Sequence, residues 1–103
     1  MNTLIVLFNL RPEADVAAYE QWAKSTDLPI VRSLGSVSSF NVYRSAGLFG
    51  SGSPAPYSYI EVIDVSDLEQ FGGELGSDTM RRVAGEFQKF ADNPVFILSN
   101  NIS

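Results

Sequence analysis

Tyr57–Val65, with the sequence YSYIEVIDV, has the strongest β-propensity in the chain because β-branched and aromatic side chains fill most of its positions. We therefore expect a strand here. An earlier segment, Val37–Arg44 (VSSFNVYR), alternates apolar and polar side chains and predicts a second strand. Between them, residues 45–56 (SAGLFGSGSPAP) are rich in Gly, Ser, Pro and Ala. The three segments together predict a β-hairpin with a long loop.

The segments before this hairpin predict a strand and a helix. Thr3–Leu10 (TLIVLFNL) is a short apolar run, which is typical of a strand buried on both faces. Residues 13–25 carry apolar side chains at helical spacing and charged side chains on the other side. We expect this helix to end at Asp27-Leu28-Pro29, because a proline pushes the preceding residue out of the helical region.

The segments after the hairpin predict a broken helix and a last strand. Ser66-Asp67-Leu68-Glu69 fits a capping box, with Ser66 as the N-cap and Glu69 reaching back. We expect Gly72 and Gly73 to interrupt the helix that follows. Ser77 or Asp78 then caps a second helix that carries an apolar stripe and continues to Asn93-Pro94. Val95–Ser99 (VFILS) is the expected final strand.

The resulting order is β-α-β-β-α-β over residues 1–103, which predicts one domain of the α+β class. Its architecture is ferredoxin-like, with an antiparallel four-stranded sheet and both helices on one face. Leu4, Val6 and Phe8 alternate with Ile5 and Leu7, so both faces of the first strand are apolar. Because two helices cover only one face, we expect a homodimer in which the bare faces pack sheet on sheet, as in a dimeric α/β barrel.

Composition narrows the chemistry. Seven Lys and Arg against twelve Asp and Glu give a net charge of −5, which argues against a nucleic-acid-binding surface. The chain has no cysteine and no histidine, and its carboxylates do not have metal-ligand spacing. We therefore expect no metal and no cofactor, and any acid–base chemistry falls to carboxylates, Tyr, Lys, backbone or bound water.

The sequence predicts neither a membrane partner nor a phosphate-binding loop. Residues 1–10 are apolar but have no basic segment before them and no small-residue cleavage site after them, so we expect no signal peptide and a cytoplasmic protein. The glycines at 47, 50 and 52 are not followed by the Gly-Lys-Ser/Thr of a nucleotide loop. We interpret this loop as a mobile lid, as an arm that lies on a partner subunit through Leu48 and Phe49, or as a plain solvated loop.

Several segments resemble the REDY-like (HapK-like) family of the dimeric α/β-barrel superfamily. The resemblance is carried by WAKSTDLP at 22–29, Val31-Arg32, Ser36-Val37, YSYIEVIDV at 57–65 and FADNPVFIL at 90–98. It implies secondary metabolism, in pathways to prodigiosin-type tripyrrole pigments and related alkaloids, with a hydrophobic pyrrolic or indolic intermediate as the ligand. Ser58 departs from the family pattern, in which we expect an acidic residue, so a carboxylate at that position cannot act here.

Glu61 is the candidate catalytic residue with the clearest physical reason. It lies in the middle of an apolar strand, on the same side as Tyr57 and Tyr59 by alternation, and an unpartnered buried carboxylate costs several kcal/mol. One interpretation is a carboxyl with a raised pKa that binds a pyrrole N–H or moves a proton. The other is an ion pair with Arg32 or Arg44 at the dimer interface.

Other side chains are candidates to line the ligand pocket. Tyr59 is the second catalytic candidate, and the ligand-binding candidates are Asn9, Tyr19, Trp22, Asp27, Arg32, Tyr57 and Phe87. For the helical aromatics the alternative is simple core packing. For Asp27 it is a helix cap, and for Asn9 it is a hydrogen bond to a loop.

The sequence thus supports a homodimer that binds a pyrrolic or indolic intermediate and assists a cofactor-free condensation, cyclisation or delivery step. One alternative is a cofactor-independent monooxygenase that positions its substrate with Trp22, Asn9 and a tyrosine. The other is a non-catalytic carrier that leaves its ligand unchanged.

Overall fold

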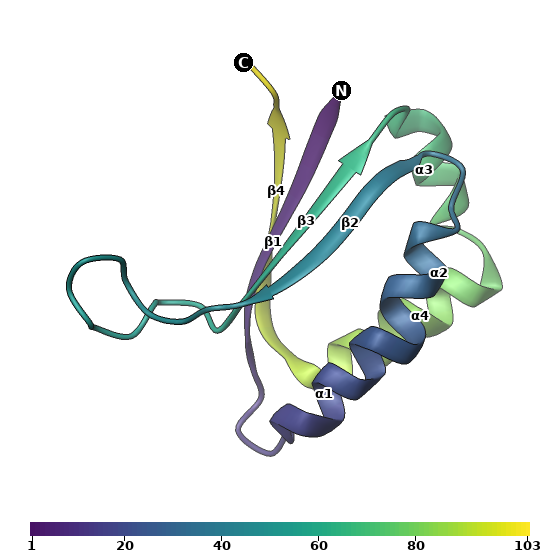
Figure 1. Cartoon of the computed structure of the whole chain (residues 1–103). Coiled ribbons are helices and arrows are strands. Elements are labelled where there is room, and N and C mark those ends of the chain that lie inside the picture. The colour runs from purple at the N-terminus through teal and green to yellow at the C-terminus, as the bar shows by residue number, and fades with distance from the viewer.

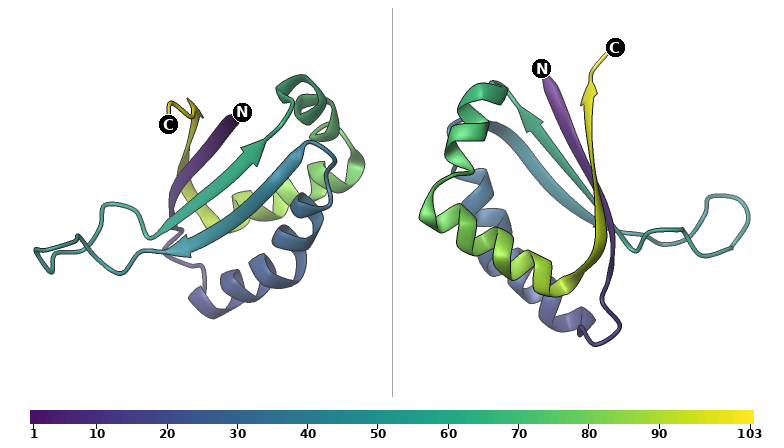
Figure 2. Two further views of the ribbon diagram at one scale, coloured as in Figure 1. Left: turned by 45° about the horizontal axis from the view of Figure 1, so that its top comes forward. Right: turned by 180° about the vertical axis from the view of Figure 1, so that it is seen from behind.

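The computed structural model describes all residues from Met1 to Ser103. Four strands, β1 (Asn2–Leu10), β2 (Val37–Arg44), β3 (Tyr59–Val65) and β4 (Ala91–Asn100), form one antiparallel sheet in the order β2-β3-β1-β4. The helices lie on one side of the sheet and leave the other side uncovered, and the two chain ends lie close together (Figures 1 and 2). This order and layering confirm the predicted ferredoxin-like α+β architecture.

The first helical region is longer than the sequence predicted. α1 (Val16–Trp22) begins at Asp15, whose side chain accepts the backbone N–H of Ala18 at 3.0 Å. It continues without a break through a π-helical turn, η1 (Ala23–Asp27), into α2 (Leu28–Arg32). The expected end at Asp27-Leu28-Pro29 is therefore wrong. The N–H of Leu28 bonds to the carbonyl of Ala23, five residues back, and this wider turn accommodates Pro29, the second residue of α2.

The second helical region also differs in detail. Asp67, rather than Ser66, caps α3 (Leu68–Glu74) by accepting the backbone N–H of Gln70 at 3.0 Å. The Ser66 hydroxyl donates instead to the carbonyl of Ser36. Gly72 and Gly73 do not interrupt α3, because buried Phe71 anchors the helix and each glycine costs only about 1 kcal/mol.

The last helix and strand meet without a linker. Ser77 caps α4 (Asp78–Phe90) as predicted, and the buried stripe of α4 is Met80, Val83 and Phe87. β4 starts at Ala91, four residues before the predicted start. It is an edge strand, so it accommodates Pro94, and a register shift in its pairing with β1 adjoins Asn93, which has a φ of 44°.

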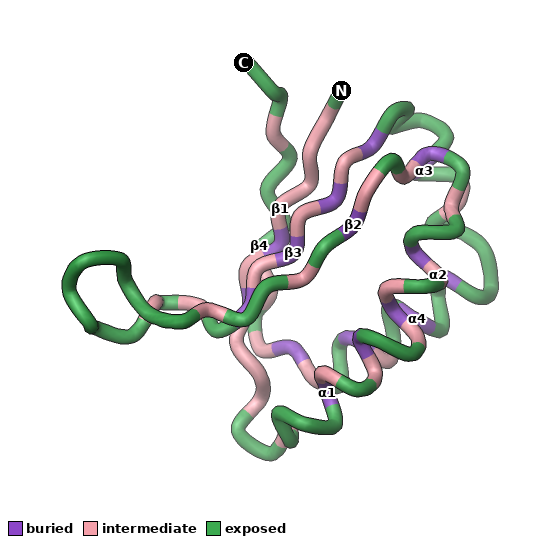
Figure 3. The backbone as a smooth tube through the Cα atoms, in the orientation of Figure 1, coloured by how far each residue is buried: buried purple, intermediate pink, exposed green.

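The core lies between the sheet and the helices in two buried clusters. One cluster is centred on Phe8 and includes Tyr19, Tyr59 and Phe87. The other is centred on Phe40 and Ile63 and extends to α2, α3 and α4. Leu4 and Val42 pack against both, so the clusters form a continuous layer. Figure 3 shows the buried positions at the centres of the strands and on the helix faces toward the sheet.

Residues 45–58, here called the arm, connect β2 to β3 and project away from the helices (Figure 1). Phe49 is fully exposed in the arm and Leu48 is also exposed. Gly47, Gly50 and Gly52 have φ values of 129°, 84° and 75°, a region that L side chains rarely adopt. The arm extends on the side of the uncovered sheet face rather than over the helices (Figure 1).

We expect Val65→Ala to destabilise the fold by roughly 2–3 kcal/mol, because Val65 is 1% exposed and its loss opens a small core cavity. Urea denaturation measures this change. The matched control is Val16→Ala at the start of α1, where the side chain is 53% exposed, and its effect should stay within about 0.5 kcal/mol. Equal effects of the two substitutions would contradict the described core.

Candidate functional site

A cavity of about 270 Å³ lies between the sheet and the helices. Cross-strand pairing places Val6, Glu61 and Phe96 side by side on the face of the sheet that carries the helices. Twelve of the fifteen lining residues are hydrophobic, and the lining consists of Leu4, Val6, Asp27, Val31, Phe40, Glu61, Ile63, Phe71, Leu75, Met80, Val83, Ala84, Phe87, Gln88 and Phe96. The cavity is thus an apolar chamber whose only ionisable groups are Asp27 and Glu61, and its volume suits a small aromatic molecule.

Asp27 reaches the cavity because of its place in the helical repeat. Tyr19, Ala23, Asp27 and Val31 are all buried, and they follow one another at intervals of four residues. In a regular α-helix such a stripe drifts around the axis, since one turn takes 3.6 residues. The π-helical turn Ala23–Asp27 adds a residue to one turn and keeps the stripe facing the sheet. π-Helical turns of this kind occur frequently at functional sites.

Glu61 lies opposite Asp27, at the centre of the sheet. β3 is paired on both sides, with Val6 of β1 and Val42 of β2 as the direct neighbours of Glu61. Glu61 is 5% exposed, and its Oε2 atom has no hydrogen-bond partner in the chain. Burial and the nearby Asp27 raise the pKa of Glu61 to about 8. Burial also raises the pKa of Asp27 to about 7, so both carboxyls exchange protons near neutral pH.

The structure does not support the ion-pair interpretation of Glu61. Arg44 binds Glu20, and Arg32 donates to the carbonyl of Phe40 at 2.9 Å and to Asn41 at 3.3 Å. Asp27 is likewise not a helix cap, because its side chain makes no capping hydrogen bond. Both carboxyls therefore belong to the cavity, and Arg32 lies outside it.

Tyr19 adds a third polar group to this buried region. It is fully buried, and its hydroxyl has no hydrogen-bond partner in the chain. Burial and the charges of Glu61 and Asp27 raise its pKa far above the ordinary value of 10.0, so the hydroxyl keeps its proton. Tyr19 also lines a hollow of about 240 Å³ between α1 and β2, together with Glu20, Arg44 and Tyr59.

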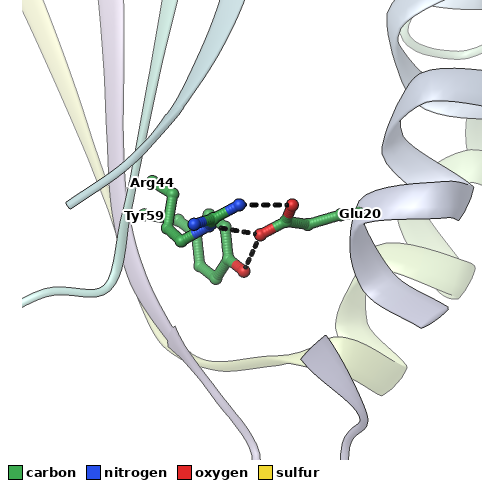
Figure 4. Close-up of polar contacts among 3 residues, drawn as sticks. All are labelled: Glu20, Arg44 and Tyr59. Atoms are coloured by element: carbon green, nitrogen blue, oxygen red, sulfur yellow. Dashed lines mark hydrogen bonds and ion pairs between the residues drawn. The ribbon is translucent and has the colours of Figure 1, made fainter. Parts of the chain in front are cut away.

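Glu20, Arg44 and Tyr59 form a polar network at that hollow (Figure 4). Arg44 donates to both carboxylate oxygens of Glu20, at 2.7 and 3.1 Å, and the Tyr59 hydroxyl donates to Glu20 at 2.7 Å. These hydrogen bonds lower the pKa of Glu20 to about 2, while burial and the bond to Glu20 raise the pKa of Tyr59 to about 12. The hydroxyl of Tyr59 is thus hydrogen-bonded to Glu20 of α1 and does not enter the cavity that holds Glu61.

The remaining predicted residues separate into one that lines the cavity and three that do not. Phe87 lines the cavity. The Trp22 indole N–H donates to Glu86 at 2.8 Å. Asn9 donates to the carbonyl of Pro56 and accepts the N–H and the hydroxyl of Ser58, which matches the alternative that it pairs with a loop. Tyr57 lines a separate groove at the base of the arm.

That groove has a volume of about 560 Å³ and is larger than the cavity. The arm itself forms much of it, and Asn9, Arg44 and Tyr59 from the groove already have hydrogen-bond partners. We favour the smaller cavity as the functional site because it lies between sheet and helices, is mostly apolar, and holds a buried polar atom without a partner, Oε2 of Glu61.

Sequence reasoning missed the pairing of Asp27 with Glu61. The available signal was a carboxylate at the four-residue spacing of Tyr19, Ala23 and Val31, on the buried stripe of a helix. The rule that a proline ends a helix hid this signal, because it placed Asp27 in a turn.

We expect Glu61→Gln to make the chain more stable at pH 8 than the unmodified protein, by about 2–4 kcal/mol. The pKa of Glu61 is about 8 when folded and 4.5 as the ordinary value. The contribution of Glu61 to the free energy of unfolding is therefore most favourable below pH 4.5 and declines as the pH rises toward 8. Urea denaturation between pH 4 and 9 measures this slope, which the substitution should flatten.

Glu20→Gln provides the contrast, because the pKa of Glu20 is about 2 when folded. Its stabilisation is present above pH 4.5 and is lost as the pH falls toward 2, so this variant should change the profile on the acid side. A Glu61→Gln profile parallel to that of the unmodified protein between pH 5 and 8 would contradict the burial of this carboxyl.

Comparison with known proteins agrees with this fold. HapK from Hahella chejuensis has a TM-score of 0.79 and 26% identity, covering 99% of this chain and 93% of that chain. SnoaB, a cofactor-independent oxygenase from Streptomyces nogalater, has a TM-score of 0.78 and 13% identity, covering 99% of this chain and 93% of that one. A dimeric ferredoxin-like protein of unknown function from Thermobifida fusca has a TM-score of 0.76 and 13% identity, covering 97% and 90%.

No curated protein matches the sequence. The family model of the REDY-like protein HapK matches residues 2–102, which confirms the resemblance seen in the sequence and supports a protein connected with secondary metabolism. The chain therefore belongs to the REDY-like HapK family.

Proposed function

We propose that this protein binds a hydrophobic pyrrolic or indolic intermediate of secondary metabolism in the cavity between sheet and helices. The observation that carries the proposal is an apolar cavity with an unpartnered carboxyl, Glu61, at its wall. A flat aromatic ring packs well against Phe40, Phe87 and Val83, and a ring N–H supplies the hydrogen bond that Glu61 lacks in the chain. Membership of the HapK family supports an intermediate on the way to a prodigiosin-type pigment.

Within this proposal the protein assists a cofactor-free condensation, cyclisation or delivery step. Glu61 and Asp27 have pKa values of about 8 and 7, which lie near the pH at which a carboxyl both gives and accepts a proton effectively. Glu61 is therefore the proposed catalytic residue, and Asp27, which the sequence assigned to ligand binding, assists it. Tyr59 has a supporting role, because its hydroxyl orients Glu20 rather than the ligand.

The monooxygenase alternative has less support in the geometry. It assigned the positioning of the substrate to Trp22, Asn9 and a tyrosine, yet Trp22 and Asn9 lie outside the cavity and have hydrogen-bond partners of their own. Tyr19 is the only tyrosine hydroxyl near the carboxyls. Consumption of oxygen on mixing with the pathway intermediate would favour this alternative, and release of the intermediate unchanged would favour a carrier.

Mass spectrometry of small molecules that copurify with the protein identifies the ligand class. We expect Ala84→Phe to reduce the yield of bound molecules, and the affinity for indole, by at least about tenfold, because residue 84 lies at the exposed rim of the cavity and a benzyl group there fills it. The matched control is Ala18→Phe on the exposed face of α1, which should bind normally. Equal binding by both variants would place the ligand elsewhere.

We also propose that the protein is a homodimer joined through the uncovered face of the sheet. Cross-strand pairs place apolar side chains on this face from three strands, namely Ile5, Leu7, Ile60, Val62, Val95 and Ile97. Val95 and Ile97 are 38% and 43% exposed. Exposed apolar surface of this extent is typical of an interface, and the related fold from Thermobifida fusca is described as dimeric. The arm lies on the same side, where Leu48 and Phe49 can pack against the partner.

Light scattering at micromolar concentration should return the mass of two chains. We expect Val62→Lys to yield a folded monomer, because the ammonium group lies at the centre of the apolar face. Val16→Lys on α1 is the control and should remain dimeric. A single-chain mass for the unmodified protein would contradict the proposed dimer.

The helices of this chain are too short and too polar for any of them to span a membrane.

A further inference from the structure

Three ionisable side chains lie near one another in the interior without any cation among them. Asp27 comes from η1, Glu61 from β3 and Tyr19 from α1, and each is 5% exposed or less. The single ion pair of the chain joins Glu20 to Arg44 and involves none of the three. Two carboxyls therefore line one apolar cavity, and no positive side chain of the cavity wall neutralises either of them.

Elements of the sheet and the helices surround this group, and β1, α2 and β4 contribute Leu4, Val6, Val31 and Phe96 to the cavity wall. α1 contributes Tyr19 and, farther out, Glu20, which is bound to Arg44 and Tyr59. β2 places Phe40 at the cavity wall, while α3 places Phe71 there. α4 contributes Met80, Val83, Ala84, Phe87 and Gln88, none of which carries a charge. The pair consequently faces a wall with negative or neutral groups only.

A cavity of this kind has an electrostatic preference for its occupant. An unpaired carboxylate in an apolar site is costly, so the pair holds its protons while the cavity lacks a cation. The pKa values of about 7 for Asp27 and 8 for Glu61 agree with this state. A positively charged planar ligand would instead favour the ionised form of one carboxyl, because a charge-assisted hydrogen bond to a carboxylate is about twice as strong as a neutral one.

We propose that the cavity binds its ligand as a cation, a protonated nitrogen heterocycle or amidinium-like group, held between Asp27 and Glu61, and that one carboxyl of the pair releases its proton to solvent on binding. The inference rests on the proposed function and specifies the charge state of the ligand. The ring body packs on the apolar wall, and the N–H edge points to the pair. No covalent bond changes in this step.

Isothermal titration calorimetry with two probes of nearly equal shape tests the proposal. The probes are 2-naphthamidine, which is a cation across the pH range, and 2-naphthamide, which is neutral. We expect the amidine to bind at least about tenfold more tightly at pH 7, with an affinity that rises between pH 6 and 9. Titrations in phosphate and in Tris, which differ in their enthalpies of ionisation, should show that each bound amidine releases up to one proton.

Two variants test whether Asp27 and Glu61 cause the preference for the amidine. Asp27→Asn and Glu61→Gln should each remove most of the preference for the amidine and reduce the release of protons, while both remain folded by circular dichroism. Glu13→Gln is the matched control, because Glu13 is exposed before α1 and its substitution also removes one carboxyl. It should retain the preference of the unmodified protein for the amidine. If the Glu13→Gln variant also loses this preference, the preference comes from the overall charge of the protein and not from Asp27 and Glu61.

The outcomes separate this inference from the proposed function. If the amide binds as tightly as the amidine without release of protons, and Ala84→Phe blocks both, then the cavity binds aromatic molecules as proposed. In that case the inference that its ligand is a cation is overturned. If neither probe binds at millimolar concentration, or if Ala84→Phe leaves binding unchanged, the cavity is not the ligand site and both proposals are overturned.

Discussion

The packing of Phe8 is the contact on which the arrangement of the helices and the sheet depends. Its ring, which has no exposed surface, stacks on Tyr59 at 5.4 Å and meets the edges of Tyr19 at 5.6 Å and Phe87 at 4.9 Å. These partners belong to β3, α1 and α4, so a single side chain of β1 fixes both long helical regions against the sheet. Val6 lies two residues before Phe8 on the same face and lines the cavity. The cavity is thus the space left beside a fully packed aromatic cluster.

The sequence predicted what local patterns determine and missed what docking determines. Alternation placed Glu61 on the same side of β3 as Tyr59, and the apolar pattern of β2 matched Val37–Arg44. The meeting of Asp27 with Glu61 depends on where α1, η1 and α2 lie over the sheet, which no local rule contains. A proline usually ends a helix, but here a wider turn accommodates Pro29 and the burial of Val31 outweighs the local preference. The error in the helix boundary therefore hid that Asp27, already a ligand-binding candidate, lies in the same cavity as Glu61.

The polar side-chain atoms of the other candidates already have hydrogen-bond partners within the chain. The indole N–H of Trp22 has Glu86, the amide of Asn9 has Pro56 and Ser58, and the hydroxyl of Tyr59 has Glu20. Each of these groups stabilises the fold and has little capacity left for a ligand. Glu61 and Tyr19 differ because a polar atom of each stays unpartnered in the interior. Residue type alone cannot separate the two groups, since the distinction lies in which neighbours the fold supplies.

The two faces of β3 connect the proposed site with the proposed dimer. Glu61 points to the helices, and its neighbour Val62 points to the uncovered face opposite Ile5. A slip of one residue in the register of β3 would exchange these positions and bring a carboxylate into the apolar interface. Pairing with β1 on one side and β2 on the other fixes the register along seven residues. The hydrogen bonds of this central strand therefore direct the costly carboxyl of Glu61 into the cavity and place the apolar side chains of Ile60 and Val62 on the opposite face.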